Sequence, residues 1–376
     1  MVSPACAACG SVAEGLLRCS KCLAVSYCSR TCQVAHWKAG HKAACRQSPP
    51  PLQYPMSFKR DPATFYDKIT SSVCDELLEN GYVVVDNFLG RGWAEALLAE
   101  VKWLAAANLL ESNKTQFPKA DGTVAQFEKP NIFEADLHNA GVRCQVPELD
   151  ALFHQDDLCL ALAAHTKLDL VPGTNGKTLK VQHNAGAGGC FPCHYDNPGR
   201  PNKRKLTCLL YLNPTWAPGD GGEIQFYPFL AAEPVTLAPL MDRLVIFSSD
   251  SLLHRVLPAQ KARHCLTIWL DSATINRAED TQLSLTASDL GDGWPEFLKR
   301  LAKMPVQRLL SRGVYAEEYL ESLAQCMGSA KEGFAEMVAS HEAHLARLAL
   351  NQPLYALIER MRANRAGLQQ CAQETG

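Results

Sequence analysis

The chain has 376 residues, 47% of them apolar, so it can bury one large core together with smaller satellite units. A formal net charge of −2 at pH 7 gives no overall electrostatic reason to expect nucleic acid or an anionic membrane as the main partner. The apolar run Val101 to Leu110 is short and is interrupted by Lys102 and Asn108, so we expect no membrane-spanning segment. The first residues lack the basic and apolar segments of a secretory signal, so we expect none.

Residues 1–46 form a cysteine block that predicts two zinc sites. Seven of the sixteen cysteines of the chain crowd into this block, and this uneven distribution favours metal over disulfides. The block offers thiolate or imidazole ligands in four pairs: Cys6 with Cys9, Cys19 with Cys22, Cys28 with Cys32, and His41 with Cys45. Eight ligands complete two tetrahedral sites, which a segment this short needs because it cannot build an adequate core. Thiolate ligands need a reducing compartment, so we expect a cytoplasmic or nuclear location.

The second half of this block resembles a known zinc module. The sequence from Tyr27 to Lys38, followed by His41 and Cys45, is similar to that of the MYND finger. In that family the ligand pairs interleave, which implies one zinc on Cys6, Cys9, Cys28 and Cys32 and a second on Cys19, Cys22, His41 and Cys45. One extra residue between His36 and His41 leaves both histidines open as the ligand, and we predict His41.

The resemblance to MYND fingers also implies a role for the block. Such fingers take up short proline-containing peptides, so we expect a recruitment module without catalytic activity. A zinc-stapled appendage that only folds is the simpler alternative. A surplus of Lys and Arg in the block could suit nucleic acid, but small zinc modules are often basic without binding it.

Residues 47–60 are rich in proline and predict a stiff, extended linker before a second domain at 61–275. That domain opens with a helical pattern from Val73 to Glu79, which ends at Asn80 and Gly81. A β-branched strand follows at Tyr82 to Val85. Helical periodicity returns from Trp93 to Leu110. The domain therefore opens as helix, strand, helix.

Short strands separated by Gly, Pro and Asn dominate from about 179 to 271. The expected strands are Lys180 to His183, Leu206 to Leu212, Glu223 to Tyr227, Arg243 to Phe247 and Cys265 to Leu270. Such a density of strands predicts a mainly β core, a jelly roll or double-stranded β-helix, flanked by helices. Residues 287–376 form a helical C-terminal region, in which apolar residues recur at helical spacing. Core packing, a dimer seam and a substrate lid are its possible roles.

Three residues of the barrel predict an iron site. His194 and Asp196 are two positions apart, a spacing that points both side chains to one face of a strand. His254 follows an apolar strand and completes a facial triad of two histidines and one carboxylate. Such a triad leaves open positions on Fe(II) for a chelating co-substrate and O2. Cys190 and Cys193 match a haem-attachment pattern beside His194, but we expect them to pack as small residues.

Arg263 strengthens the iron hypothesis. It begins a strand in which Arg263, Thr267 and Trp269 share one face, so all three can look into the barrel. A guanidinium fork can pair bidentately with the distal carboxylate of 2-oxoglutarate, and arginine keeps its charge at any physiological pH. Together with the triad, Arg263 predicts an Fe(II)- and 2-oxoglutarate-dependent dioxygenase.

From about Asn80 to Asp271 the chain resembles the prolyl 4-hydroxylase branch of these dioxygenases, especially the hypoxia-factor prolyl hydroxylases. The landmarks are residues 80–90, 194–198, 208–213, 221–222 and 243–247. Some of those hydroxylases also carry an N-terminal MYND finger. The resemblance implies that Tyr211 hydrogen-bonds the co-substrate, that Ile224 and Trp269 line its pocket, and that Thr267 assists Arg263. It also implies ascorbate as a reductant.

Two departures from that family limit what the resemblance implies. Asn184 stands where the animal hydroxylases have a tyrosine at the iron-proximal end of the co-substrate, so we expect Asn184 to hold that end differently. The segment Phe127 to Asp136 also lacks the Arg-x-Asp motif that the hypoxia-factor hydroxylases have in their substrate loop. The leading hypothesis is prolyl hydroxylation of a protein or peptide. Oxidation of another side chain or a metabolite is one alternative, and a non-catalytic MYND adaptor with a vestigial barrel is another.

Overall fold

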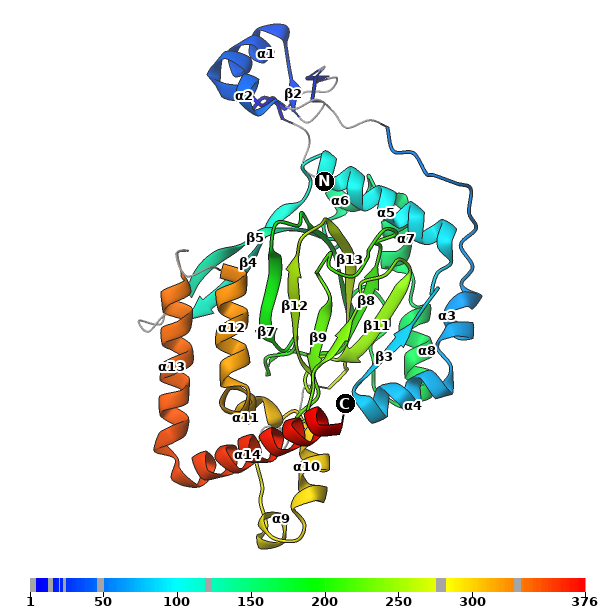
Figure 1. Cartoon of the computed structure of the whole chain (residues 1–376). Coiled ribbons are helices and arrows are strands. Elements are labelled where there is room, and N and C mark those ends of the chain that lie inside the picture. Colours follow the sequence, from blue (N-terminus) through cyan, green and yellow to red (C-terminus); the bar gives the residue numbers. More distant parts are fainter. Residues whose placement is uncertain are drawn as a thin grey trace. The chain divides into compact units, whose positions relative to one another are not determined.

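A computed structural model describes residues 5–12, 16–19, 21–22, 25–45, 51–118, 124–199, 201–274, 282–327 and 333–375 (Figure 1). The chain divides into two compact units. One comprises residues 1–53 with 103–108, and the other comprises 54–102 with 109–376. In the described part, no helix has both the length and the apolar character needed to cross a membrane. The C-terminal helices thus belong to the same unit as the barrel.

The finger consists of two short strands followed by short helical segments. These are β1 (Leu17–Arg18), β2 (Ser26–Tyr27), α1 (Arg30–His36), the π-helical turn η1 (Trp37–His41) and α2 (Lys42–Ala44). Ser29 caps α1 by accepting a hydrogen bond from the backbone N–H of Cys32, which fixes Cys32 in the first turn. Its small core consists of Tyr27 and the buried cysteines, as expected for a module that metal must complete.

The second unit opens with helices on either side of one strand, as the sequence predicts. They are α3 (Ala63–Lys68), α4 (Ser71–Asn80), β3 (Tyr82–Val85) and α5 (Arg91–Ala106). Thr70 caps the start of α4 and Gly81 ends it in the left-handed conformation. The end of the expected linker is anchored, because Tyr54 donates a hydrogen bond to the buried Glu100 of α5. Residues 47–50, the first part of that linker, lie outside the described residues.

Two antiparallel sheets form the barrel. A seven-stranded sheet has the order β3-β11-β8-β13-β6-β5-β4, and a four-stranded sheet has the order β10-β9-β12-β7. Their bounds are β4 (Glu111–Pro118), β5 (Val124–Asp136), β6 (Lys177–Asn184), β7 (Gly189–His194), β8 (Arg204–Tyr211), β9 (Ile224–Tyr227), β10 (Val235–Leu237), β11 (Arg243–Ser248), β12 (Leu253–Ala259) and β13 (Arg263–Asp271). This mainly β core confirms the jelly roll. The long β4–β5 hairpin was not expected from the sequence, and the segment Phe127 to Asp136 lies in it.

Helices cover the outer faces of the barrel. On the seven-stranded sheet lie α7 (Pro147–His154) and α8 (Asp157–Thr166), preceded by the short α6 (Ala140–Arg143). The carboxylate of Glu100 accepts hydrogen bonds from the backbone N–H groups of Glu148 and Leu149, and so satisfies the N-terminus of α7. These contacts tie α7 to α5 within the helical layer.

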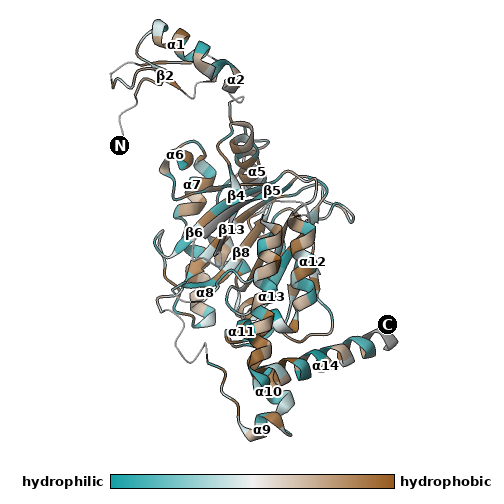
Figure 2. Cartoon of the chain, turned by 90° about the vertical axis from the view of Figure 1, so that its left-hand side faces the viewer, coloured by the Kyte–Doolittle hydropathy of each residue, from teal (hydrophilic) through white to brown (hydrophobic). Residues whose placement is uncertain are grey.

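The C-terminal region is helical, as predicted. It comprises α9 (Ala287–Leu290), α10 (Trp294–Ala302), α11 (Gln307–Val314), α12 (Ala316–Met327), α13 (Phe334–Leu350) and α14 (Gln352–Thr375). One buried apolar cluster joins Cys193, Tyr227 and Leu253 of the small sheet to α10, α11 and α14. Figure 2 shows apolar residues concentrated in the barrel strands, while polar and apolar residues alternate along the C-terminal helices. The region therefore packs against the four-stranded sheet.

Candidate active site and metal centres

The predicted iron triad converges at the ends of two paired strands. His194 ends β7, His254 is the second residue of β12, and the two are partners in the antiparallel register. Asp196 lies in the loop after β7, with Oδ1 3.3 Å from His194 Nε2 and 3.8 Å from His254 Nε2. One ligand atom from each residue lies within 4.8 Å of the others. This convergence fits one metal ion and leaves a side of it open.

Hydrogen bonds orient each member of the triad. The Nδ1 of His194 lies 2.8 Å from the Pro192 carbonyl oxygen, and the Nδ1 of His254 lies 3.2 Å from the Leu252 carbonyl oxygen. In both rings Nε2 is thereby directed to the site, as in other histidine metal ligands. Burial lowers the pKa of His254 to about 4, so its imidazole is neutral and can bind a metal.

The second oxygen of Asp196 is held by two donors. Thr207 Oγ1 donates to Asp196 Oδ2 at 2.7 Å, and Trp269 Nε1 donates to the same oxygen at 3.0 Å. Burial alone would raise the pKa of Asp196, but the hydrogen bond from His194 and the neighbouring imidazoles hold it below its usual range. Asp196 therefore stays ionised, with Oδ1 facing the histidines. Trp269 thus orients a metal ligand in addition to lining the cavity.

The far end of the same cavity carries the predicted arginine. Arg263 is 3% exposed, and its guanidinium lies 4.9 Å from the Tyr211 ring centroid. Arg263 Nε, Thr267 Oγ1 and Tyr211 Oη are buried without a hydrogen-bond partner among the described residues. Buried polar atoms rarely stay unpaired, so Arg263 and Thr267, which line the cavity, fit a ligand with several acceptor oxygens. Gly222 makes the room, since a Cβ there would approach Arg263 Cδ to 2.7 Å.

One cavity of about 200 Å³ connects the two ends. Its lining includes the triad together with Arg263, Ile224, Thr267 and Trp269, as the sequence predicts. The predicted Tyr211 lies behind Arg263 and does not itself line the cavity. An elongated dicarboxylate with a chelating end suits this cavity, because metal ligands stand at one end and a guanidinium at the other.

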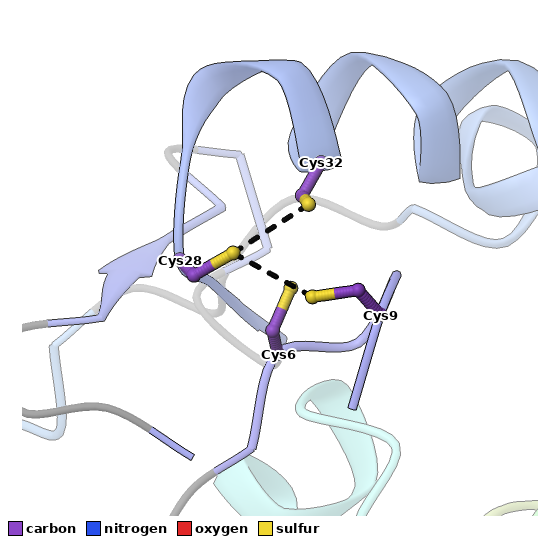
Figure 3. Close-up of side chains that lie close together, drawn as sticks. All are labelled: Cys6, Cys9, Cys28 and Cys32. Carbon is purple, nitrogen blue, oxygen red and sulfur yellow. Dashed lines mark hydrogen bonds between the residues drawn. The ribbon is translucent and has the colours of Figure 1, made fainter. Parts of the chain in front are cut away.

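The predicted zinc ligands of the finger form two separate groups. In the first, Cys28 Sγ lies 3.6 Å from Cys9 Sγ and 3.5 Å from Cys32 Sγ, with Cys6 completing the group (Figure 3). In the second group, Cys19 Sγ is 3.8 Å from Cys45 Sγ, and Cys22 Sγ is 3.5 Å from His41 Nε2. Four thiolate or imidazole atoms at these separations fit tetrahedral zinc.

The structure also separates the two candidate histidines of the finger. His41 is buried and belongs to the second group of ligands. His36 stacks on the His41 ring with centroids 4.9 Å apart, and its Nδ1 lies 3.0 Å from the Tyr27 hydroxyl. The predicted ligand, His41, is therefore the histidine that faces the cysteines.

Comparisons with known proteins assign a family to the barrel and to the finger. Residues 179–271 match the 2OG-Fe(II) oxygenase superfamily, and residues 6–45 match the MYND finger. A crystal structure of a prolyl 4-hydroxylase from Phytophthora capsici is 53% identical, covers 84% of this chain and 99% of that chain, and superposes with a TM-score of 0.74. The chain belongs to the prolyl 4-hydroxylase family.

More distant prolyl hydroxylases match the same part of the chain. Human prolyl hydroxylase EGLN3 is 27% identical over 213 residues, which cover 54% of this chain and 83% of that protein. The hypoxia-inducible factor prolyl hydroxylase of Caenorhabditis elegans is 26% identical over 215 residues, but these cover only 28% of its length. The chain is thus a 2OG-Fe(II) oxygenase of the prolyl hydroxylase type, which uses Fe(II) and 2-oxoglutarate and carries a zinc-binding MYND finger.

In this prolyl 4-hydroxylase, Asn184 does not line the cavity, contrary to the prediction that it holds one end of the co-substrate. Its Nδ2 donates to the Gly189 carbonyl oxygen at 2.8 Å, and its Oδ1 accepts from the Gly186 N–H at 3.0 Å. Both polar atoms of the amide are thus used to close the turn between β6 and β7. Asn184 is 2% exposed and is absent from the cavity lining. An asparagine before a glycine-rich turn is itself a signal for such a role.

Sequence reasoning missed several residues of this prolyl 4-hydroxylase site. Thr207, which holds Asp196, shares a strand face with Leu209 and Tyr211, so alternation along β8 could have identified it. The polar wall of the cavity gave no such signal, because it depends on how the β4–β5 hairpin pairs with β6. The residues of that wall are Asn113, Lys129, Glu134, Lys180 and Gln182.

The C-terminal helices of this prolyl 4-hydroxylase brace the strand and loop that carry His194 and Asp196. Residues adjacent to both iron ligands turn outward and contact α11 or α12. The contacts are Cys193 N–H to Ser322 Oγ at 3.0 Å, Tyr195 hydroxyl to Gln307 Oε1 at 3.4 Å, Arg308 Nη1 to the Asn197 carbonyl oxygen at 2.8 Å, and the Cys190–Cys326 disulfide. Cys190 is therefore bonded to α12, and the expectation that it only packs as a small residue is wrong.

Proposed function

We propose that this enzyme hydroxylates prolyl residues of a protein or peptide substrate, with ascorbate maintaining the iron in its ferrous state. The cavity is the observation that supports the proposal, since it joins the triad to Arg263. Family membership adds the expectation of a prolyl target. A prolyl side chain would enter on the open side of the iron, near Arg204 and Trp269, whose guanidinium and ring lie 4.1 Å apart.

Each residue of the cavity has a defined part in that reaction. His194, Asp196 and His254 would hold Fe(II), which with O2 and 2-oxoglutarate supplies the oxidation of an aliphatic C–H bond to C–OH. Arg263 and Thr267 bind the distal carboxylate of the co-substrate, with Tyr211 supporting the guanidinium from behind. Thr207 and Trp269 hold Asp196 in the orientation that turns Oδ1 to the histidines. Ile224 and Leu209 exclude water from the buried end of the cavity.

We further propose that the finger holds two zinc ions and recruits a partner through a proline-containing peptide. The two ligand groups support the metal count, because each contains four donor atoms. Zinc thiolates require reduced cysteines, so a cytosolic or nuclear location suits this module, and the Cys190–Cys326 disulfide would be exceptional in that compartment.

Turnover of peptides by the intact enzyme tests the catalytic proposal. Proline-containing peptides incubated with Fe(II), 2-oxoglutarate and ascorbate are expected to gain one oxygen atom on proline, detected by tandem mass spectrometry, with succinate released in step. His254→Ala is expected to abolish both signals. Oxidation of only a free metabolite, or only of residues other than proline, would overturn the proposal.

A further inference from the structure

A lysine of the unexpected hairpin places its charge inside the active-site cavity. Lys129 on β5 lines the same cavity as the iron triad and Arg263. Its Nζ lies 4.6 Å from the centroid of the Phe191 ring, and that ring stacks 6.3 Å from the imidazole of His194. The ammonium therefore sits on the iron side of the cavity, away from the arginine at the far end.

The charge of Lys129 is not neutralised by the surrounding protein. Its Nζ donates to the neutral Asn113 Oδ1 at 2.8 Å, and no carboxylate lies within 4.0 Å of it among the described residues. Asn113 in turn donates to Glu134, but the other oxygen of Glu134 already accepts from Lys180 at 2.7 Å. The wall thus carries two ammonium groups against one carboxylate. A partly buried cation with this environment is suited to an anionic ligand.

The iron end of the cavity also lacks the side chain expected to hold the co-substrate there. Asn184 uses both of its polar atoms within a turn. The co-substrate is a dianion, and Arg263 at the far end can pair with only one of its carboxylates. The second carboxylate must lie beside the metal, because it chelates there together with the keto oxygen. Two cavity-lining cations on that side, Lys129 and Arg204, have no carboxylate within 4.0 Å among the described residues. The guanidinium of Arg204 is already used, because it lies on the Trp269 ring and donates to the Asp196 carbonyl oxygen at 3.3 Å, which leaves Lys129 for the co-substrate.

We propose that Lys129 binds the iron-proximal carboxylate of 2-oxoglutarate and acts as a positioning residue for it. The proposal rests on the use of 2-oxoglutarate by the enzyme, and it is independent of the identity of the hydroxylated residue. Lys129, on β5, binds the end of the co-substrate that Asn184, on β6, was expected to hold. A charge-assisted hydrogen bond of this kind contributes about 1.5–3 kcal/mol, or a factor of about 10–100 in affinity.

Calorimetric titration of the full-length, Mn(II)-loaded enzyme with 2-oxoglutarate tests this without requiring turnover. Lys129→Met is expected to raise the Kd about tenfold or more, while Lys129→Arg keeps the charge and recovers most of the affinity. The matched control is Lys114→Met, which removes an exposed ammonium from the same hairpin outside the cavity. Its Kd is expected to stay within about threefold of wild type.

Two outcomes would overturn the proposal. The first is an unchanged Kd for 2-oxoglutarate in Lys129→Met, and a raised KM for peptide in that variant would then assign Lys129 to an acidic group of the substrate. The second is an equal loss of affinity in Lys114→Met, which would indicate a general effect of removing a positive charge from the hairpin. Mn(II) affinity and the melting temperature of each variant are measured alongside, so that a folding defect is recognised.

Discussion

The two walls of the active-site cavity differ in how their polar groups are arranged. One wall, from β7, β8, β12 and β13, carries the triad and Arg263, and its donors point at defined positions for iron and a carboxylate. The other wall, from β4, β5 and β6, is a chain of polar groups running from Lys129 through Asn113 and Glu134 to Lys180. The first wall is fixed by strand alternation within the barrel. The second depends on contacts between segments that have little secondary-structure signal in the sequence.

The largest expected effect tests the first wall at the metal. Asp196→Ala removes a ligand, so iron affinity is expected to fall by more than the factor of about 10–100 that supporting residues around a metal control. Metal analysis of the purified protein should show the loss of iron while zinc in the finger stays at its wild-type content, which makes the finger an internal control. Full iron occupancy in this variant would contradict the triad.

The second-largest effect is expected at Arg263, at the far end of the same wall. Arg263→Met removes the guanidinium that faces the distal carboxylate, so the Kd for 2-oxoglutarate is expected to rise about 10- to 100-fold. Arg263→Lys should recover only part of the affinity, because an ammonium cannot form the two parallel hydrogen bonds of the fork. Calorimetry on the Mn(II)-loaded enzyme gives both values. An equal affinity for the lysine variant would show that charge alone matters there.

A smaller loss is expected from the residue that orients Asp196. Thr207→Val removes the hydroxyl that donates to Asp196 Oδ2, so iron affinity should fall about tenfold. Ser249→Ala is the control, because Ser249 contacts the Thr207 hydroxyl at 2.8 Å without touching Asp196. Equilibrium dialysis against Fe(II) under anaerobic conditions measures both. A similar loss in the two variants would mean that packing around the hydroxyl, and not the bond to Asp196, is responsible.

Because the second wall carries Lys129, we expect the affinity for 2-oxoglutarate to depend on pH. Burial lowers the pKa of Lys129 to about 8, with Glu134 and Asp196 raising it and Lys180 lowering it. Because the charged form is the one that attracts a carboxylate, 2-oxoglutarate affinity should be high below pH 8. It should fall about five- to tenfold between pH 7 and pH 9 as the ammonium is lost. Lys129→Arg should remove this fall, and a fall that persists in that variant would assign it to another group.

The smallest expected effect concerns the helices behind the iron strand. Ser322→Ala leaves the buried N–H of Cys193 without its acceptor, so the free energy of unfolding should drop by about 1–2 kcal/mol. Gln325→Ala, on the exposed side of the same helix, should change it by less than about 0.5 kcal/mol. Urea denaturation measures both values. Equal values for the two variants would show that α12 does not support β7 through Ser322.

The sequence predicted the first wall because its residues are fixed by short spacings. His194 and Asp196 are two positions apart, and Arg263, Thr267 and Trp269 alternate along a single strand, so local geometry limits where they can point. Asn184 shows that the distance of a residue from a family motif is not sufficient to assign it the role that the family has at that position. Its residue type favoured a local turn with the glycines that follow, and that preference determined its place.

The second wall could not be predicted in the same way. Glu111 to Lys114 are polar and carry little β-propensity, so no strand was expected there, and β4 forms because it pairs with β5. Lys129 enters the cavity only because β5 also pairs with β6, through partners such as Ile132 with Asn184. Such pairing is set by tertiary packing. The disulfide between Cys190 and Cys326, 136 residues apart, is equally non-local.

The contacts between β7 and α12 have a practical consequence for the design of truncated proteins. The superfamily match ends at residue 271, and a truncated protein that stops there would contain the triad and Arg263. It would nevertheless expose the outward side of the strand that carries His194, where Cys190 and Cys193 now contact α12. Recombinant fragments for crystallography or inhibitor screening should therefore extend through α12 and its neighbours. We expect the smallest autonomous catalytic piece of this enzyme to extend beyond the superfamily match that ends at residue 271.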